Sequence, residues 1–415
     1  MTCFRDNFRF SKQTPRLAIT SARLILREYG ASITYGWRGP VKILLLNYEF
    51  PPLGGGSSPV TREIGKRYVQ RGHSVDVVTM GFGDLPKKED VDGMMVFRVP
   101  SLRRRVEICR VHELGSYIYS AHRFLTNRLK HTHYDVNHTH FLLPTGLVAR
   151  TMKRRFGLPY IVSGHGSDIP GYNPDRFRWT HRFTQPALRR VGGDASRITV
   201  MSNYLADLVR ENVADYAPEH LIKIPNGIDR KEFRSGDKKN IILSTGRLLR
   251  RKGFQHLIRA VSDDDIGYEV HICGDGPMLD ELRAAAARSR TKIVLHGWVE
   301  NQSEYYRDLL SSAAIYVLAS ERENSSIALL EGMSAGCATI TTNAAGCPET
   351  LGDAGVLVQP GSADDLRQAI LSIVANDDLR LALQQRAVER VRSVFDWDRI
   401  VDRYEKELLL AAESR

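Results

Sequence analysis

Two glutamates, Glu323 and Glu331, stand eight residues apart in a stretch that reads as a loop, a helix and a short strand. Apolar residues recur at helical spacing between Ser326 and Ala335, which predicts a helix capped by a serine. The start of a helix presents free backbone N–H groups and a partial positive charge, which favours an anionic phosphate. Carboxylates on either side of such an anion site suit a nucleotide sugar, with one binding ribose hydroxyls and the other binding sugar hydroxyls.

A basic turn earlier in the chain offers a second set of candidates. Arg247 and Lys252 lie between a predicted strand that ends near Thr245 and a helix that starts near Gly253. Arginine offers two parallel N–H donors and lysine a point charge, and together they suit a departing diphosphate. A solvated surface turn would have the same composition, so the residue types alone leave both interpretations open.

Two loops of the first half follow predicted strands and carry further candidates. Gly55 and Gly56 belong to a glycine triplet after the first strand, where a loop backbone can approach a phosphate closely. His165 stands between two glycines just past a later strand, so we expect its ring to have little cover and to face a ligand in the crevice outside the strand ends. Asp168 is a candidate to orient His165 or to bind the acceptor.

Together these strings resemble the family 4 retaining glycosyltransferases, which have the GT-B fold. Glu323 and Glu331 match the E-x7-E signature of that family, and the match continues through Gly346, Pro348 and Glu349. The resemblance extends over nearly the whole chain from residue 41 and includes the Gly-Gly loop, the G-R-x-x-x-x-K-G turn and the His-Gly-x-Asp loop. It implies catalytic roles for His165, Arg247, Lys252 and Glu323.

The resemblance also implies where the two substrates bind. The second half of the chain would bind the donor nucleotide sugar, and the first half would bind the acceptor, with Asp168 as an acceptor-binding candidate. Trp298 and Val299 would flank the base. The string Asn324-Ser325-Ser326 departs from the Gly-Phe-Gly or Pro-Phe-Gly turn of the family, and because this turn would lie against the donor sugar, the identity of the sugar stays open. The implied donor-binding residues are Gly55, Gly56, Gly246, Arg247, Lys252, Trp298, Val299, Glu323, Asn324, Ser325, Ser326, Ile327 and Glu331.

No metal ion or other cofactor is expected. Four histidines cluster between His131 and His140, and His138 and His140 point to the same side of a strand, but no carboxylate or cysteine completes a ligand set nearby. Asp90-Val-Asp92 has the spelling of metal-dependent transferases of another fold, yet it stands before Gly93 in what reads as a hairpin turn. Basic side chains are expected to neutralise the diphosphate.

The candidate residues follow two successive series of strands and helices. These predict two doubly wound, Rossmann-like α/β domains that face each other across a cleft. The predicted domains are residues 41–235, which bind the acceptor, and 240–395, which bind the nucleotide sugar. The resemblance implies that a helix in residues 396–415 returns to the first domain. Residues 1–40 lack periodicity and are expected to be a disordered extension, or an addition upstream of a natural start near residue 41.

The composition restricts the kinds of site that the protein can have and the compartment in which it is expected. No apolar run approaches the ~18–20 residues that span a bilayer. The five cysteines form no C-x-x-C pair, so neither a disulfide framework nor a zinc site is indicated, and a cytoplasmic location is expected. Residues 41–239 hold 32 Lys and Arg against 20 Asp and Glu, whereas residues 240–415 hold 20 against 26.

The basic first half predicts an anionic partner, for which the inner face of the membrane is the candidate. The basic clusters are Arg103–Arg105 and Lys153–Arg155. An amphipathic helix over Leu114–Leu129 would lay its apolar side either on the core or in the membrane interface. Such peripheral binding would suit a lipid-linked acceptor.

The expected function is a retaining hexosyl or N-acetylhexosaminyl transferase, acting from a nucleotide sugar on a glycan or lipid-linked acceptor in cell-surface polysaccharide or glycolipid synthesis. A nucleotide-sugar epimerase of the same fold, which acts without an acceptor, is one alternative. A non-enzymatic basic binding protein is the other. Nucleic-acid binding is disfavoured because aromatic residues are not interleaved with basic ones in a recognisable module.

Overall fold

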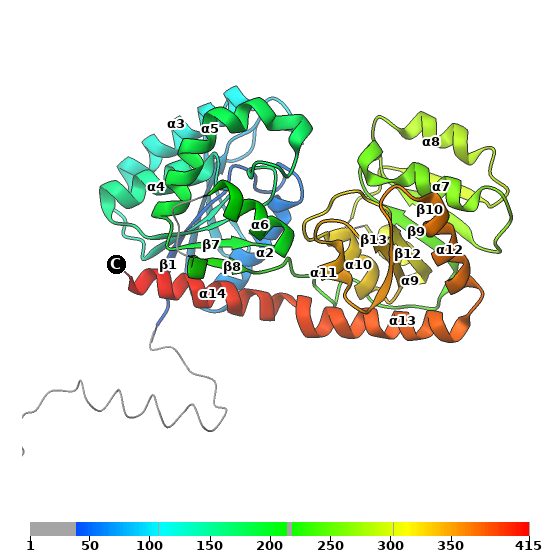
Figure 1. The fold of residues 1–415 in the computed structure, drawn as a ribbon. Coiled ribbons are helices and arrows are strands. Elements are labelled where there is room, and N and C mark those ends of the chain that lie inside the picture. Colours follow the sequence, from blue (N-terminus) through cyan, green and yellow to red (C-terminus); the bar gives the residue numbers. More distant parts are fainter. Residues whose placement is uncertain (1–38, 107, 214–217, 302, 415) are drawn as a thin grey trace, which may run out of the picture. The chain divides into compact units, whose positions relative to one another are not determined.

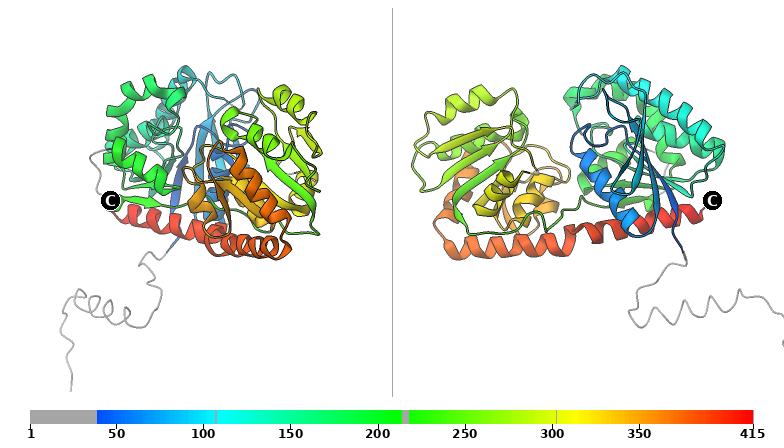
Figure 2. Two further views of the ribbon diagram at one scale, coloured as in Figure 1. Left: turned by 45° about the vertical axis from the view of Figure 1, so that its right-hand side comes forward. Right: turned by 180° about the vertical axis from the view of Figure 1, so that it is seen from behind.

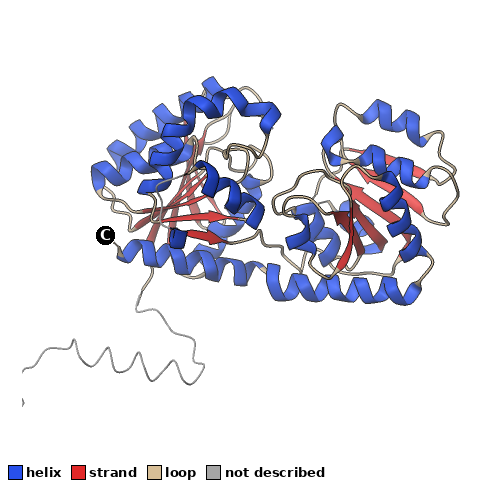
Figure 3. Ribbon diagram, in the orientation of Figure 1, coloured by secondary structure: helices blue, strands red, loops and turns tan. Residues whose placement is uncertain are grey.

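The structure, a computed structural model, describes residues 39–106, 108–213, 218–301 and 303–414. Residues from Pro40 onward form one compact unit that holds two sheets with helices on both faces (Figures 1 and 3). The predicted fold class, two Rossmann-like α/β domains, is confirmed. The predicted N-terminal extension, residues 1–40, lies outside the described residues except for its last two.

The first sheet has the strand order β3-β4-β2-β1-β5-β6-β7-β8, with β3 antiparallel to β4 and the other neighbours parallel. Its central strands read as continuous buried runs, which is typical of parallel sheets covered on both faces. The strands are β1 (Lys42–Leu46), β2 (Ser74–Met80), β3 (Lys88–Val91), β4 (Met94–Val99), β5 (Val136–His140), β6 (Tyr160–Ser163), β7 (Arg197–Val200) and β8 (Leu221–Lys223). The helices are α2 (Ser57–Gln70), α3 (Val111–Arg128), α4 (Thr145–Phe156), α5 (Pro174–Asp194), α6 (Asn203–Asn212) and the short η1 (Pro218–His220).

The second sheet is parallel throughout and has the order β11-β10-β9-β12-β13-β14. Its strands are β9 (Lys239–Thr245), β10 (Glu269–Cys273), β11 (Ile293–Gly297), β12 (Ala313–Leu318), β13 (Ala338–Thr342) and β14 (Gly355–Val358). The helices are η2 (Arg250–Lys252), α7 (Phe254–Val261), α8 (Leu279–Ala286), α9 (Glu304–Ser312), α10 (Ile327–Ser334), α11 (Cys347–Leu351), α12 (Ala363–Val374), α13 (Asp377–Arg390) and the π-turn η3 (Val391–Phe395).

The last helix, α14 (Trp397–Glu413), packs against β5, β6 and α2 of the first sheet. Figure 2 shows α13 and α14 following one another along the same side of the two sheets. His73 Nδ1 accepts a hydrogen bond from Val41 N–H at 3.2 Å, so its Nε2–H donates to Glu405 Oε1 at 2.7 Å. The final helix therefore packs on the first sheet and is held there by a side-chain hydrogen bond.

The structure decides between the two alternatives for one predicted helix and adds a helix that was not predicted. Helix α3 spans Val111–Arg128, and its apolar residues Tyr117, Ala121 and Leu125 are fully buried in the core, so they are not free for a membrane interface. Helix α5 was not predicted; it begins with Pro174 and contains Pro186 in its interior, which sequence rules treat as a helix breaker. Tertiary packing overrides that local preference.

Candidate functional site

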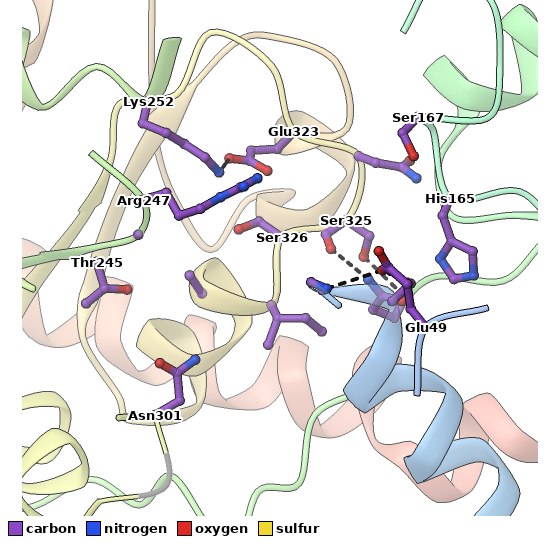
Figure 4. Close-up of a pocket in the computed structure, with 18 of the residues that line it drawn as sticks. Glu49, His165, Ser167, Thr245, Arg247, Lys252, Asn301, Glu323, Ser325 and Ser326 are labelled. Carbon is purple, nitrogen blue, oxygen red and sulfur yellow. Dashed lines mark hydrogen bonds and ion pairs between the residues drawn. The ribbon is translucent and has the colours of Figure 1, made fainter. Parts of the chain in front are cut away.

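A cleft of about 510 Å³ lies where the loops after the strands of both sheets meet (Figure 4). The glycine loop follows β1, His165 follows β6, Arg247 follows β9 and Glu323 follows β12. The cleft brings together His165 and every residue predicted to bind the donor, whereas Asp168 is not among the residues that line it. The individual roles of these residues remain predictions.

Arg247 and Lys252 lie on the turn between β9 and α7. The turn ends at Gly253, whose φ of +76° favours glycine. A Cβ at this position would lie 2.0 Å from the carbonyl oxygen of Ala319, so the turn packs directly on the end of β12. Lys252 forms an ion pair with Glu323 (Figure 4). The predicted diphosphate contact and the predicted sugar contact are thus joined.

Glu331 is a buried carboxyl within α10. The predicted cap of this helix is confirmed, because Ser326 Oγ accepts a hydrogen bond from Leu329 N–H at 3.3 Å. Tyr306 O–H donates to Glu331 Oε2 at 2.5 Å. Burial raises the pKa of Glu331 to about 7, although the Tyr306 bond opposes the shift. A ligand hydroxyl that donates to Glu331 would favour its charged form.

Glu49 is a cleft residue that the sequence did not reveal. Its Oε2 accepts hydrogen bonds from Gly55 N–H at 3.2 Å and from Ser57 Oγ at 3.1 Å (Figure 4). The Gly55 N–H predicted to meet a phosphate is therefore engaged by a carboxylate in this structure. A glutamate six residues before a glycine pair is an unremarkable spacing, and only the path of the loop brings the two together.

His165 is better covered than its glycine neighbours suggested. Its ring lies 4.6 Å from that of Phe141 and 5.1 Å from that of His140, centroid to centroid, and its Nε2 is 2.9 Å from His140 Nδ1. Burial lowers its pKa. The ring has more cover than expected because His140, the last residue of β5, and Phe141, which follows it, lie against the ring. One side of the ring still lines the cleft (Figure 4).

Asp168 holds the backbone of the His165 loop. Oδ1 accepts from the N–H groups of His165 and Gly166, both at 3.0 Å, and Oδ2 accepts from Leu142 N–H at 2.7 Å. Burial raises the pKa of Asp168 to about 6 against these three stabilising bonds. The proposed acceptor contact is corrected: the carboxylate is buried and directed at backbone amides, so it orients the loop.

The unusual turn Asn324–Ser326 is tied to the first half of the chain. Ser202 Oγ accepts from Leu205 N–H at 3.1 Å, so its hydroxyl proton donates to Asn324 Oδ1 at 2.6 Å. Asn226 donates through its backbone N–H to Ser325 Oγ at 3.2 Å and through Nδ2 to Ser325 O at 2.8 Å. Sequence reasoning missed Ser202, which lies 122 residues from its partner.

Within the described part of the chain, no group of three or more His, Cys, Asp or Glu side chains is placed to hold a metal ion. His138 and His140 do share one face of β5, as predicted, and their rings stack at 4.5 Å inside the core. Asp90 and Asp92 lie at the β3–β4 hairpin, where Asp90 Oδ1 accepts from Gly93 N–H at 3.0 Å and Arg62 pairs with Asp92 at 2.7 Å. The independence from metal remains a prediction.

Two protein-family models match consecutive parts of the chain. The model described as "Glycosyltransferase Family 4" matches residues 54–232, and "Glycosyl transferases group 1" matches residues 226–390. The two matches meet in the segment between β8 and β9.

Named relatives and a solved structure agree with these matches. The chain is 24% identical over 388 residues to N-acetyl-alpha-D-glucosaminyl L-malate synthase of Bacillus anthracis, covering 85% of this chain and 93% of that one. It is 24% identical over 385 residues to the phosphatidylinositol N-acetylglucosaminyltransferase GPI3 subunit of Saccharomyces cerevisiae, covering 85% and 79%. HepE of Anabaena, solved in complex with UDP, shares the fold with a TM-score of 0.71 at 16% identity, covering 88% and 99%.

Proposed function

The chain belongs to the family 4 glycosyltransferases of the GT-B fold, and from this we propose that it moves a sugar from a nucleotide-sugar donor to a glycan or lipid-linked acceptor with retention of configuration. The observation that most supports the proposal is the cleft, where candidate residues from distant parts of the chain meet. The reaction would serve polysaccharide or glycolipid synthesis, and the phosphatidylinositol in the name of the Saccharomyces cerevisiae relative supports the glycolipid alternative.

Arg247 and Lys252 would stabilise the charge that develops on the diphosphate as the bond to the sugar breaks. Preorganised cations and N–H groups act strongly in a cleft that excludes water, because the local dielectric is low. Glu331, set deep in α10, would accept hydrogen bonds from ribose hydroxyls. Glu323 would accept from sugar hydroxyls and, through its ion pair, place Lys252 at the leaving group.

Retention would follow from attack on the face of the sugar that the diphosphate leaves. The acceptor hydroxyl gives up its proton to the departing phosphate as the new glycosidic bond forms, so that no covalent sugar–enzyme intermediate is needed. His165 would lie beside the reacting sugar, because it lines the cleft from the first half of the chain. No metal ion is required, since the basic turn supplies positive charge.

The transfer experiment uses the full chain with a panel of radiolabelled nucleotide sugars, each with and without lipid-linked and soluble glycan acceptors. Uridine diphosphate sugars come first, because HepE binds UDP and both named relatives are N-acetylglucosaminyl enzymes. We expect label to enter an acceptor, with the anomeric configuration of the donor kept. A sugar interconverted without acceptor would identify an epimerase, and no reaction with any donor would contradict the proposal.

A lipid-linked acceptor is favoured by the surface beside the cleft. We call the exposed residues Leu102, Arg104, Arg105, Ile108, Arg110 and Val111 the arginine rim. Leu102, Ile108 and Val111 are 63%, 40% and 59% exposed, and Ile108 also lines the cleft. Arginines bind anionic headgroups while apolar side chains enter the interface, so the rim would dock the cleft mouth on an anionic membrane. A lipid-linked acceptor would then reach the cleft without leaving the bilayer.

The basic clusters predicted from sequence are only partly available for such docking. Arg103 is buried, and its Nη2 donates to Val106 O at 2.7 Å. Lys153 Nζ donates to Asp194 O at 2.6 Å, and Arg154 lies 3.5 Å from the Asp194 carboxylate. The proposed docking therefore rests on the arginine rim. Among the described residues, no helix is long and apolar enough to cross a membrane.

A further inference from the structure

Three histidine rings form a row that leads from the cleft into the first sheet. His138 and His140 lie two residues apart on one face of β5, and His165 follows β6. The ring centroids are 4.5 Å apart for His138 and His140 and 5.1 Å apart for His140 and His165. His138 and His140 are fully buried, and only His165 reaches the cleft. The proposed reaction so far uses His165 and leaves the two rings behind it without a purpose.

His138 and His140 differ in how their nitrogens are satisfied. His138 Nδ1 lies 3.2 Å from Tyr68 Oη, and its Nε2 lies 2.9 Å from Ser163 Oγ. His140 Nδ1 lies 2.9 Å from His165 Nε2. His140 Nε2 is buried and has no hydrogen-bond partner among the described residues. His140 therefore has a single polar connection, and it leads to the cleft histidine.

That single connection can be made in two ways. If His165 Nε2–H donates to His140 Nδ1, then neutral His140 carries its own proton on Nε2, where it is a buried N–H without an acceptor. If His140 Nδ1–H donates instead, the unpartnered His140 Nε2 is a lone pair and His165 carries its proton on Nδ1. Orphaned buried N–H groups are rare because the loss of their hydrogen bonds to water is not compensated, so the second arrangement is favoured. Doubly protonated rings are disfavoured, since burial lowers the pKa of both.

We propose that His140 is a positioning residue that donates its Nδ1–H to His165 Nε2 and so presents the Nδ1–H of His165 to the cleft as a hydrogen-bond donor. This deepens the proposed function and rests on it for its role in transfer. His165 would then stabilise an oxygen of the sugar or of the acceptor, and it would not accept the acceptor's proton. The Asp168 bonds to the loop amides fix the backbone, and His140 fixes the ring.

The first test needs no activity. In protein labelled with ¹⁵N-histidine at neutral pH, two-bond ¹⁵N–¹H correlations report which ring nitrogen carries the proton. The resonances are assigned by their loss in His140→Asn and in His165→Gln. We expect His165 and His140 both to be protonated on Nδ1. A His165 ring protonated on Nε2 would overturn the proposal, whatever reaction the protein catalyses.

The second test separates positioning from packing. Asparagine can place an amide N–H close to the Nδ1–H of histidine, whereas leucine fills space without a donor. We expect His140→Leu to lower kcat roughly tenfold to a hundredfold, with KM for the nucleotide sugar changed less than about twofold. His140→Asn should keep most of the activity. Equal losses in both variants, or full activity in His140→Leu, would contradict a positioning role.

Tyr68→Phe is the matched control, because it removes the hydroxyl beside His138 Nδ1 and leaves the bond between His140 and His165 in place. It should keep both kcat and the tautomer of His165. If His140→Leu does not fold, as judged by its melting temperature, the correlations of the unaltered protein decide the question. If no sugar transfer is found with any donor, the proposed function fails while the assigned tautomer can still be true.

Discussion

Arg247 and Lys252 differ in what surrounds them at the predicted diphosphate site. Lys252 already has an anionic partner in Glu323, while the neighbouring Arg250 points away to pair with Glu281 at 2.9 Å. Arg250 belongs to the same turn but does not line the cleft. The turn thus contains its own control for a test of charge at the leaving group.

Arg247→Ala and Lys252→Ala should each lower turnover by roughly two orders of magnitude or more, as the loss of one transition-state donor typically does. Arg250→Ala should keep near-normal turnover, although it too removes one positive charge. Steady-state rates with the best donor, together with melting temperatures to exclude unfolding, check the expectation. Near-normal turnover in both cleft variants would overturn the assignment.

Glu331 gives the stability of the empty protein a pH dependence with a definite sign. Its pKa is raised to about 7 in the folded chain, so it binds a proton there that the unfolded chain has released above its ordinary value of 4.5. Its contribution is fully present below about pH 4.5 and is lost as the pH rises through 7, at up to about 1.4 kcal/mol per pH unit. Glu331→Gln cannot ionise. Its melting temperature relative to wild type should therefore rise from pH 5 to pH 8, and an unchanged difference would show that Glu331 ionises normally.

The basic turn is also the reason why we expect the protein to act without a metal ion. If Arg247 and Lys252 neutralise the diphosphate, transfer should persist in excess EDTA at a rate close to that of the untreated protein. Activity that disappears in EDTA and returns with Mn²⁺ or Mg²⁺ would show that the two side chains do not suffice. The same assay on Asp92→Ala, which removes the partner of Arg62 at the β3–β4 hairpin, should show only a mild change.

Among the elements, the junction of η2 and α7 depends on a close backbone contact at Gly253. Gly253→Ala adds a Cβ that would lie 2.0 Å from a backbone oxygen at a φ of +76°, so the turn must move. Gly361 has a similar φ of +78° with nothing within 4 Å of its Cβ, which makes Gly361→Ala a control for backbone strain alone. Gly253→Ala should lower the melting temperature and the turnover well beyond the control. Equal behaviour of the two variants would show that the close approach is unimportant.

The spacing of apolar residues, together with the capping and turn residues of the loops, was sufficient to predict the alternation of strands and helices. The helix with Glu331 shows why: its serine cap, apolar spacing and terminal glycine all indicate the same bounds, and α10 is found with Ser326 as its cap and Gly336 at a φ of +71°. Helix α5 shows the limit, because its interior proline is tolerated only through packing that no local rule contains.

Site residues could be predicted where they lie close together in one loop. They could not be predicted where their role depends on contact with a distant segment of the chain. Arg247 and Lys252 are close in sequence, so the turn that holds them could be predicted. The contact of Ser202 with Asn324 spans 122 residues, and that of His140 with His165 depends on the pairing of β5 with β6. Such contacts depend on the whole fold, which alternation of hydrophobic residues specifies only as a class.

On the scale of the whole molecule, we predict that the protein binds an anionic membrane through the arginine rim. It should co-sediment with vesicles that contain anionic lipid and detach as salt rises, since each basic residue near the surface adds about 1 kcal/mol. Arg104→Glu with Arg105→Glu should weaken this binding at least tenfold. Arg283→Glu with Arg288→Glu makes the same charge change on exposed residues around α8 and should have little effect. Equal binding to neutral vesicles, or none to either kind, would favour a soluble acceptor.

The chain passes between its two sheets twice, once after β8 and once between η3 and α14, and the two passages are joined. Ile228 N–H donates to Phe395 O at 2.8 Å, and Ile228 forms a parallel bridge with Asp396. Two backbone segments that are joined in this way resist sliding and separation of the two halves of the chain. They restrict rotation of the halves about the joint less. We therefore expect any opening of the two halves to be a rotation about this joint, which would widen the cleft most on the side far from the joint. We expect a bulky nucleotide sugar to enter from this far side of the cleft, where a rotation of a few degrees would open the widest passage.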